Sequence, residues 1–68
     1  MAAGDYYVIF EDGEWKVKLG GGRVVSAGHR TQSGAKRKAE TLGKNNNRGV
    51  VVNAKAGYTR YRKGPEEL

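Results

Sequence analysis

The chain has 68 residues, a formal net charge of +6 and no cysteine. A chain of this length makes one small domain of modest stability, and the lack of cysteine excludes disulfides and thiolate metal sites. No apolar run approaches the roughly 18 residues of a membrane span, and residues 1–5 lack the basic start and apolar stretch of a signal peptide. We therefore expect a cytoplasmic protein that does not associate with membranes.

The charge is unevenly distributed along the chain. Residues 1–14 contain four acidic residues and no basic one, whereas residues 15–63 contain all thirteen Lys and Arg against a single acid, Glu40. The local net charge of residues 15–63 is therefore +12. A positive body of this density attracts polyanions over a Debye length of about 8 Å. The pattern favours nucleic acid as a partner, although a solvated surface that keeps the protein soluble is the simpler alternative.

The chain opens with a predicted β-hairpin. Residues 6–10 are aromatic and β-branched, which favours a strand, and both faces of that strand are apolar, which favours a central place in a sheet. Asp12-Gly13 is a strong turn signal, because glycine adopts positive φ at low cost. Residues 14–19 alternate strictly and form the second strand. Its apolar residues face one way and its lysines the other: Trp15, Val17 and Leu19 against Lys16 and Lys18.

A glycine turn leads into the third strand. Gly20–Gly22 permits a simple reversal, and it lacks the spacing and the following helix of a phosphate-binding loop. Residues 23–26 then return as a strand. Residues 6 to about 28 therefore predict a three-stranded meander.

A helix follows from Gln32. Thr31 is a good N-cap, because its hydroxyl can accept an unpaired amide two or three residues ahead. Ala35, Ala39 and Leu42 form one narrow stripe of small and apolar residues, so the helix must sit close against the sheet. We expect this stripe to bury Trp15 and Val17. The remaining helix surface is charged, with Lys36, Arg37, Lys38, Glu40 and Lys44, and Asn45–Asn47 is a natural exit.

The last part of the chain predicts two more strands and completes the fold. Residues 50–52 and 58–63 have strand character, a turn at residues 55–57 joins them, and Pro65 ends the second. The order βββαββ predicts an α+β fold, with one sheet and one helix packed on one of its faces. A right-handed crossover places the fourth strand parallel beside the first, which gives the strand order 3-2-1-4-5. We expect a disordered N-terminus at 1–5, a single domain at 6–63 and an acidic tail at 64–68.

These residues resemble the pattern of domain-of-unknown-function family 2188, a family of small bacterial, archaeal and phage proteins. The resemblance covers about residues 6–63, including the last hairpin with Gly57 at its turn. The chain departs from the family pattern at Phe10, where proline is expected, and in the poorly helical Gly34 and Gly43. The family's activity is not established, so the resemblance implies a fold and no function. The matching residues are Trp15, Val17, Lys18, Gly21, Ser26, His29, Thr31, Gln32, Ala35, Ala39, Leu42 and Lys44.

A weaker resemblance concerns the mode of binding. Four features are similar to the three-stranded-sheet DNA-binding module at the N-terminus of phage integrases: Trp15-x-Val17, a glycine turn, a basic third strand and Thr31-x-x-x-Ala35-x-x-x-Ala39. That module is similar to plant AP2 domains, which lay their sheet in the major groove. The resemblance implies DNA contacts from the exposed sheet face, by analogy of fold.

Catalysis is not expected. His29 is the single histidine, and a nucleophile needs a base beside it and a third group that orients the base. His29 is better explained as a residue that caps or packs. Glu11, Asp12 and Glu14 cluster at a turn, where we expect water to solvate them, so they make neither an acid–base pair nor a metal site. We expect no enzyme activity, cofactor, metal or small-molecule substrate.

The exposed sheet face supplies the candidate binding residues. Lysine favours phosphate as a compact charge, whereas arginine can fork onto guanine in the major groove. We expect phosphate contacts from Lys16 and Lys18, base contacts from Arg23, Arg60 and Arg62, and stacking on an unpaired base from Tyr58 or Tyr61. The helix residues Lys36, Arg37 and Lys38 lie on the far side from this face; solvation is their default role, and phosphate contact is the secondary alternative.

The predicted function is therefore binding of nucleic acid with low sequence specificity, and duplex DNA is favoured over RNA as the ligand. Binding of RNA or of a single strand remains a second alternative. The first alternative is a protein-interaction module, which binds an acidic partner or forms a homodimer through an exposed sheet edge.

Overall fold

The structure is a computed structural model that describes residues 4–20 and 22–68. It contains β1 (Tyr6–Glu11), β2 (Glu14–Leu19), β3 (Arg23–His29), α1 (Gln32–Asn46), β4 (Val50–Asn53), β5 (Thr59–Lys63) and the short 3-10 helix η1 (Pro65–Glu67). Of the N-terminus predicted to be disordered, residues 1–5, the first three lie outside the described residues. Gly4 and Asp5 are held in place, because Arg48 Nη1 donates to the Gly4 carbonyl at 3.1 Å and Gly20 N donates to the Asp5 carbonyl at 2.9 Å.

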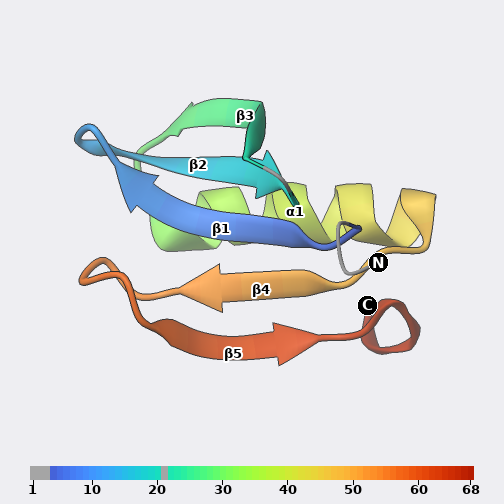
Figure 1. Cartoon of the computed structure of the whole chain (residues 1–68). Helices are drawn as coiled ribbons and strands as arrows, with labels where there is room; N and C mark the ends of the chain where they lie inside the picture. The colour runs from blue at the N-terminus through green and yellow to red at the C-terminus, as the bar shows by residue number, and fades with distance from the viewer. Residues whose placement is uncertain (1–3, 21) are drawn as a thin grey trace.

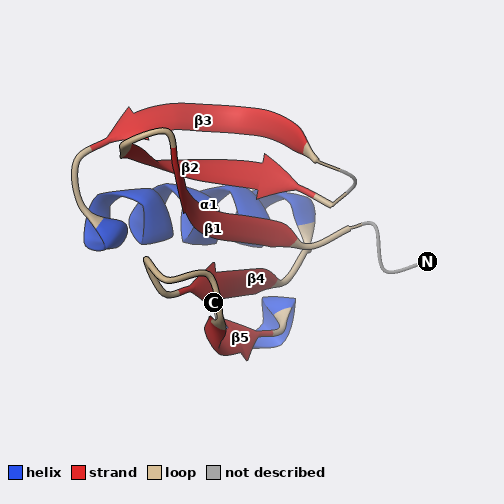
Figure 2. Ribbon diagram, turned by 60° about the vertical axis from the view of Figure 1, so that its left-hand side comes forward, coloured by secondary structure: helices blue, strands red, loops and turns tan. Residues whose placement is uncertain are grey.

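The five strands form one sheet in the order β3-β2-β1-β4-β5. β1 pairs antiparallel with β2 and parallel with β4, so the crossover through α1 places β4 beside the first strand. Helix α1 runs along one face of the sheet, and no other element of residues 4–20 and 22–68 forms a layer over the opposite face (Figures 1 and 2). The predicted α+β fold, the central place of the first strand and the strand order are therefore confirmed.

The core lies between α1 and the helix-side face of the sheet. Trp15 and Val17 are buried in one cluster with Ala35 and Ala39, as the alternation of the second strand predicts, and Leu42 packs against it. Trp15 also meets Phe10 edge-on, with the ring centroids 5.3 Å apart. The alanine stripe explains the close approach, because longer side chains there would hold the helix away from the strands. The buried members of this core cluster are Tyr6, Val8, Trp15, Val17, Ala35, Ala39, Val50 and Val52.

Gly43 also allows the close approach, although helix propensity alone makes it a weak point of α1. A Cβ atom at this position would lie 2.7 Å from the Arg48 carbonyl oxygen and 2.8 Å from Leu68 Cδ1. Real Cβ atoms do not approach a backbone atom so closely. The glycine thus exchanges helix propensity for packing against the chain that follows α1.

The ends of α1 follow the sequence signals. Thr31 Oγ1 accepts a hydrogen bond of 3.0 Å from Gly34 N, as expected for an N-cap. Asn47 adopts the left-handed conformation with φ 55°, and Arg48 N then donates to the Gly43 carbonyl at 2.8 Å. None of the helices among residues 4–20 and 22–68 is long and apolar enough to cross a membrane.

Residues 64–68, expected as an acidic tail, are part of the fold. Pro65–Glu67 form a 3-10 turn, in which Glu67 Oε1 accepts a 2.7 Å hydrogen bond from Gly64 N. Leu68 packs against the core cluster. The apolar terminal residue thus holds this acidic segment against α1.

Candidate nucleic-acid interface

The lysines of β2 lie on the sheet face away from α1, but carboxylates of the β1–β2 hairpin form ion pairs with them. In the β1–β2 register Lys16 stands opposite Ile9. Lys16 Nζ lies 3.3 Å from Glu11 Oε1 and 3.2 Å from Asp12 Oδ2, and Lys18 Nζ lies 3.2 Å from Glu11 Oε1. The two lysine side chains are only 13% and 23% exposed. They are therefore much less available to a ligand than strand alternation alone suggests.

The pKa shifts in this group agree with its geometry. Hydrogen bonds from Lys18 and then Lys16 hold the pKa of Glu11 below its usual range, and the bond to Asp12 raises the pKa of Lys16. These contacts thus favour the charged forms of Glu11 and Lys16. The acids Glu11, Asp12 and Glu14 thus have lysine partners besides water, and the longest of these contacts is the 4.0 Å between Glu14 and Lys16.

Hairpin register was the signal that could have shown this pairing in advance. A two-residue Asp-Gly turn sets Glu11 opposite Glu14, and the same register sets Ile9 opposite Lys16. Glu11 and Lys16 are then diagonal neighbours on one face, within reach of long side chains. With three carboxylates and two ammonium groups, this hairpin cluster, defined as Glu11, Asp12, Glu14, Lys16 and Lys18, has a net charge of −1.

Of the other arginine candidates, Arg62 shares the sheet face of these lysines, whereas Arg23 and Arg60 are placed differently. Arg23 pairs with Leu19, whose side chain packs against the core, so Arg23 belongs to the helix-side face. Arg62 pairs with Val51, whose neighbour Tyr7 pairs with Lys18, so Arg62 lies on the same face as the lysines of β2. Arg60 Nη1 donates a 2.7 Å hydrogen bond to Gln32 Oε1 at the start of α1. Arg23 and Arg60 therefore do not extend the predicted row of contacts on the exposed sheet face, whereas Arg62 does.

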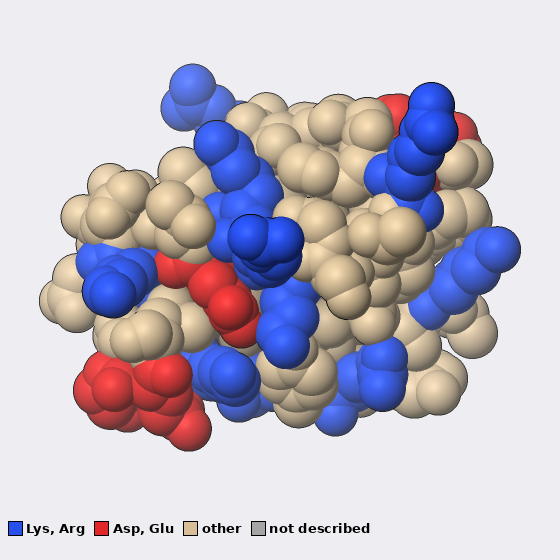
Figure 3. Space-filling view, turned by 180° about the vertical axis from the view of Figure 1, so that it is seen from behind, with Lys and Arg blue, Asp and Glu red and all other residues tan. Residues whose placement is uncertain are grey.

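The outer surface of α1 has the opposite character. Arg37, Lys38 and Lys44 are exposed, and among the described residues no carboxylate lies within 4.0 Å of their charged nitrogens. Glu40 is the one acid on the helix, and its Oε2 lies 4.0 Å from Lys36 Nζ and 3.7 Å from Lys63 Nζ. The helix-side basic surface, defined as Lys36, Arg37, Lys38, Lys44 and Lys63, has a net charge of +4 when Glu40 is included. Figure 3 shows basic side chains spread over this side of the molecule.

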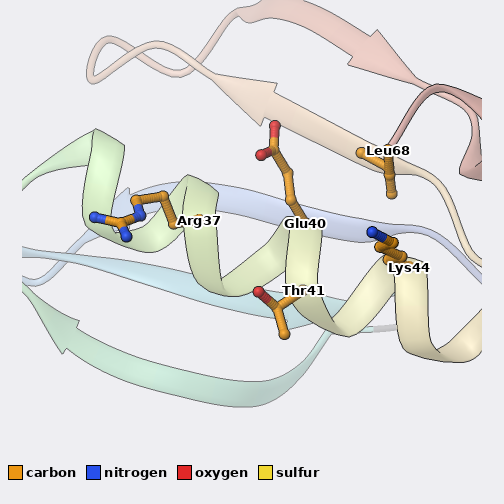
Figure 4. A pocket seen from close by; sticks show the side chains of 5 residues that line it. All are labelled: Arg37, Glu40, Thr41, Lys44 and Leu68. Carbon is orange, nitrogen blue, oxygen red and sulfur yellow. The ribbon is translucent and has the colours of Figure 1, made fainter.

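An open hollow of about 290 Å³ lies on this surface and is lined by Arg37, Glu40, Thr41, Lys44 and Leu68. Figure 4 shows Glu40 directed toward the strands, whereas Arg37 and Thr41 extend away from it. Seven residues separate Arg37 from Lys44, a rise of about 10 Å along a helix. The two cations are therefore spaced to contact different phosphates, with the Thr41 hydroxyl between them as a hydrogen-bonding group.

The two tyrosines considered for stacking differ in exposure. Tyr61 is half-buried, with Lys36 Nζ 5.4 Å and Lys63 Nζ 5.9 Å from its ring centroid. It therefore supports two lysines of the helix-side basic surface. Tyr58 is 67% exposed at the β4–β5 turn. Of these two, Tyr58 presents the ring that an unpaired base could reach.

His29 packs beside Ser26, with 2.8 Å between Nε2 and the serine hydroxyl. Both residues are half-buried at the end of β3. The register of β3 against β2 shifts twice here, between Trp15 and Val17 and between Val17 and Lys18. The contact thus links two positions of one irregular edge strand, which agrees with a structural role for His29.

The comparison with known proteins adds a family and no function. The family model DUF2188, described as an uncharacterized protein conserved in bacteria, matches residues 6–60. Neither the curated proteins nor the solved structures include a significant match.

Proposed function

The chain belongs to the DUF2188 family of uncharacterized bacterial proteins, and we propose that it binds nucleic acid through the phosphate backbone. The expected ligand is duplex DNA, which the protein contacts with little sequence specificity. The nucleic-acid partner is the one that the charge pattern favours. The contact surface, however, moves from the sheet face to the helix side.

The separation of charge between these two surfaces supports the proposal. The hairpin cluster is internally neutralised, with Lys16 and Lys18 bound to Glu11 and Asp12. The helix-side basic surface retains Arg37, Lys38 and Lys44 in an exposed, unpaired state within the described part of the chain. A polyanion is attracted where positive charge is left without a partner, because a paired ammonium group must first lose its carboxylate.

Low specificity follows from the residue types. Lysine contacts phosphate as a point charge, and phosphate contacts position a protein without reading sequence. Arg37 is the one member of the helix-side basic surface with a guanidinium that can fork onto a base edge. The β1–β5 scaffold and the capped α1 hold these side chains on a rigid frame, which lowers the entropy lost on binding.

The edges of the sheet favour this proposal over pairing with another chain. β3 is interrupted by two register shifts, and β5 has only five residues, of which Arg60, Arg62 and Lys63 are basic. Bulges, short strands and charges are features that protect sheet edges from pairing. An acidic protein that binds α1 would use the same cations, and the experiment below separates it from nucleic acid.

The proposal is tested by titrating the protein with duplex DNA over a salt series. If about four phosphates are neutralised, log K should fall with log salt at a slope of roughly −3 to −4. Arg37→Ala with Lys44→Ala should weaken binding about tenfold or more at 0.1 M salt and flatten the slope by about two. Lys16→Ala with Lys18→Ala removes the same formal charge and should have a much smaller effect.

Both double variants must first show the unfolding transition of a folded domain. Absence of DNA binding at low salt would overturn the proposed function and favour an acidic protein partner. A larger loss from the Lys16 and Lys18 variant would return the contact to the sheet face.

A further inference from the structure

The β4–β5 hairpin carries the most exposed large hydrophobic side chain of the described residues. Tyr58 is 67% exposed, and the other exposed large hydrophobic residue in that part of the chain is Val24, at 46%. Val24 pairs with Lys18 on the sheet face away from α1, whereas Tyr58 follows directly on the β4–β5 turn. A large aromatic ring kept in water at the end of a hairpin is available for stacking.

The turn that presents Tyr58 is well ordered by its own hydrogen bonds. Ala54 N donates to the Tyr58 carbonyl at 2.7 Å, and Gly57 N donates to the Ala54 carbonyl at 2.9 Å. Gly57 has φ +109°, a conformation that other residues rarely adopt. Because the backbone is already fixed, a base that stacks on Tyr58 orders little more than the ring itself.

The hairpin is also bound to the start of α1. Gln32 Nε2 donates to the Asn53 carbonyl at 2.9 Å, and Gln32 Oε1 accepts the 2.7 Å bond from Arg60 Nη1. The amide of Gln32 is uncharged, so the guanidinium of Arg60 keeps its positive charge and further donors. Figures 1 and 2 both place the β4–β5 turn at the end of the molecule where α1 begins. Arg37 lies five residues into the helix from Gln32, a rise of about 8 Å.

We infer that Tyr58 stacks on an unpaired base beside the backbone that the helix-side basic surface holds. The preferred substrate is then a nucleic acid with a single-stranded stretch next to its duplex, such as a tailed end. A paired base inside a duplex offers no free face, whereas an unpaired base can stack on an aromatic ring whatever its identity. Arg60 is placed to contact the phosphate of the same nucleotide. The inference depends on the nucleic-acid function proposed above and names its substrate class.

The test compares three DNA probes: a blunt duplex, the same duplex with a short single-stranded extension, and one whose extension is abasic. The abasic extension supplies the same phosphates without bases. The protein should bind the tailed duplex about tenfold more tightly than the abasic-tailed one, within the range for stacking of one base. Tyr58→Ala should remove this difference and leave blunt-duplex affinity unchanged, and Tyr58→Phe should keep it.

Val24→Ala is the matched control, because it shortens the other exposed hydrophobic side chain on a different surface. Equal binding of the tailed and abasic-tailed probes by the unmodified protein would overturn the inference while leaving the proposed function intact. A preference that survives Tyr58→Ala would also overturn it. Loss of the preference in Val24→Ala would show that it does not depend on Tyr58 stacking and would overturn the inference too.

Discussion

The sheet face and the helix side of this domain differ in how their basic side chains are partnered. On the sheet face, Lys16 and Lys18 share Glu11, and Lys16 also pairs with Asp12. On the helix side, Glu40 lies near Lys36 and Lys63 and leaves Arg37, Lys38 and Lys44 exposed. Formal charge is therefore a poor guide to a binding surface unless the position of each counter-charge is known.

The difference has a simple origin in local geometry. A tight hairpin brings the acids that flank its turn onto the same face as the lysines of its second strand. A helix distributes its residues around an axis, so one acid can reach only neighbours three or four residues away or on a facing strand. Glu40 cannot neutralise the whole of α1, whereas three hairpin acids can neutralise two lysines.

Both surfaces depend on the same core, so the largest expected effect is loss of the fold. Trp15→Ala should lower the free energy of unfolding by about 3–5 kcal/mol, because the ring is buried against α1 and Phe10. A small domain has little more stability than this, so much of the population should unfold. Circular dichroism with denaturant measures the effect. An unchanged cooperative transition would contradict the packing of the sheet on the helix.

The glycines of α1 provide a matched pair with a smaller effect. Gly43→Ala should destabilise the fold by about 1–3 kcal/mol, since its Cβ would meet the Arg48 carbonyl at 2.7 Å. At Gly34 a Cβ would meet Thr31 Oγ1 at 3.3 Å, so a small shift suffices and Gly34→Ala should be near neutral. Thermal unfolding of the two variants decides the point. A stabilising Gly43→Ala would show that helix propensity outweighs packing there.

Releasing the sheet-face lysines should create a second binding surface. Glu11→Gln with Asp12→Asn removes two of the hairpin acids and should raise duplex DNA affinity several-fold. The salt slope should become steeper by one to two, as two more ammonium groups reach phosphate. Glu66→Gln with Glu67→Gln removes the same formal charge at exposed positions on another part of the surface and controls for the overall field. Equal gains in DNA affinity in the two variants would mean that pairing with carboxylates does not prevent Lys16 and Lys18 from contacting DNA.

The smallest expected effect is a change of stability with pH. Because the folded pKa of Glu11 is lowered, its pairing stabilises the fold above its ordinary value of 4.5, and this contribution is lost as pH falls through the folded pKa. Because the pKa of Lys16 is raised, its side chain stays charged up to and beyond pH 10.5. Its pairing therefore stabilises the fold until the pH rises through this raised pKa. Melting temperatures of the protein and of Glu11→Gln should converge at acid pH. Parallel curves across the acid range would contradict the pairing.

Most of the fold was predictable from local patterns. The alternation of Trp15 and Val17 with two lysines identified the buried face of β2, and the handedness of crossovers placed β4 beside β1. The docking of Leu68 on Gly43 was not predictable, because it joins positions 25 residues apart without a periodic signal. Gly43 therefore looked like a defect of the helix until its neighbours were known.

The candidate site was less predictable than the fold for a physical reason. A strand pattern shows which face a side chain takes, and it does not show whether an acid on the neighbouring strand reaches it. Lys16 and Lys18 were placed on the correct face, and their partners were missed. The partner of Arg60 was missed in the same way, because its bond to Gln32 joins two elements 28 residues apart.

Backbone amide chemical shifts measured by NMR while duplex DNA is added test the central claim most directly. If the helix side binds DNA, the largest chemical-shift changes should fall on the outer positions of α1, from Arg37 to Lys44, and their amplitude should depend on salt. β2 should change little, since Lys16 and Lys18 remain bound to Glu11 and Asp12. Changes concentrated at Lys16 and Lys18, with α1 unaffected, would contradict the account and place the interface on the sheet.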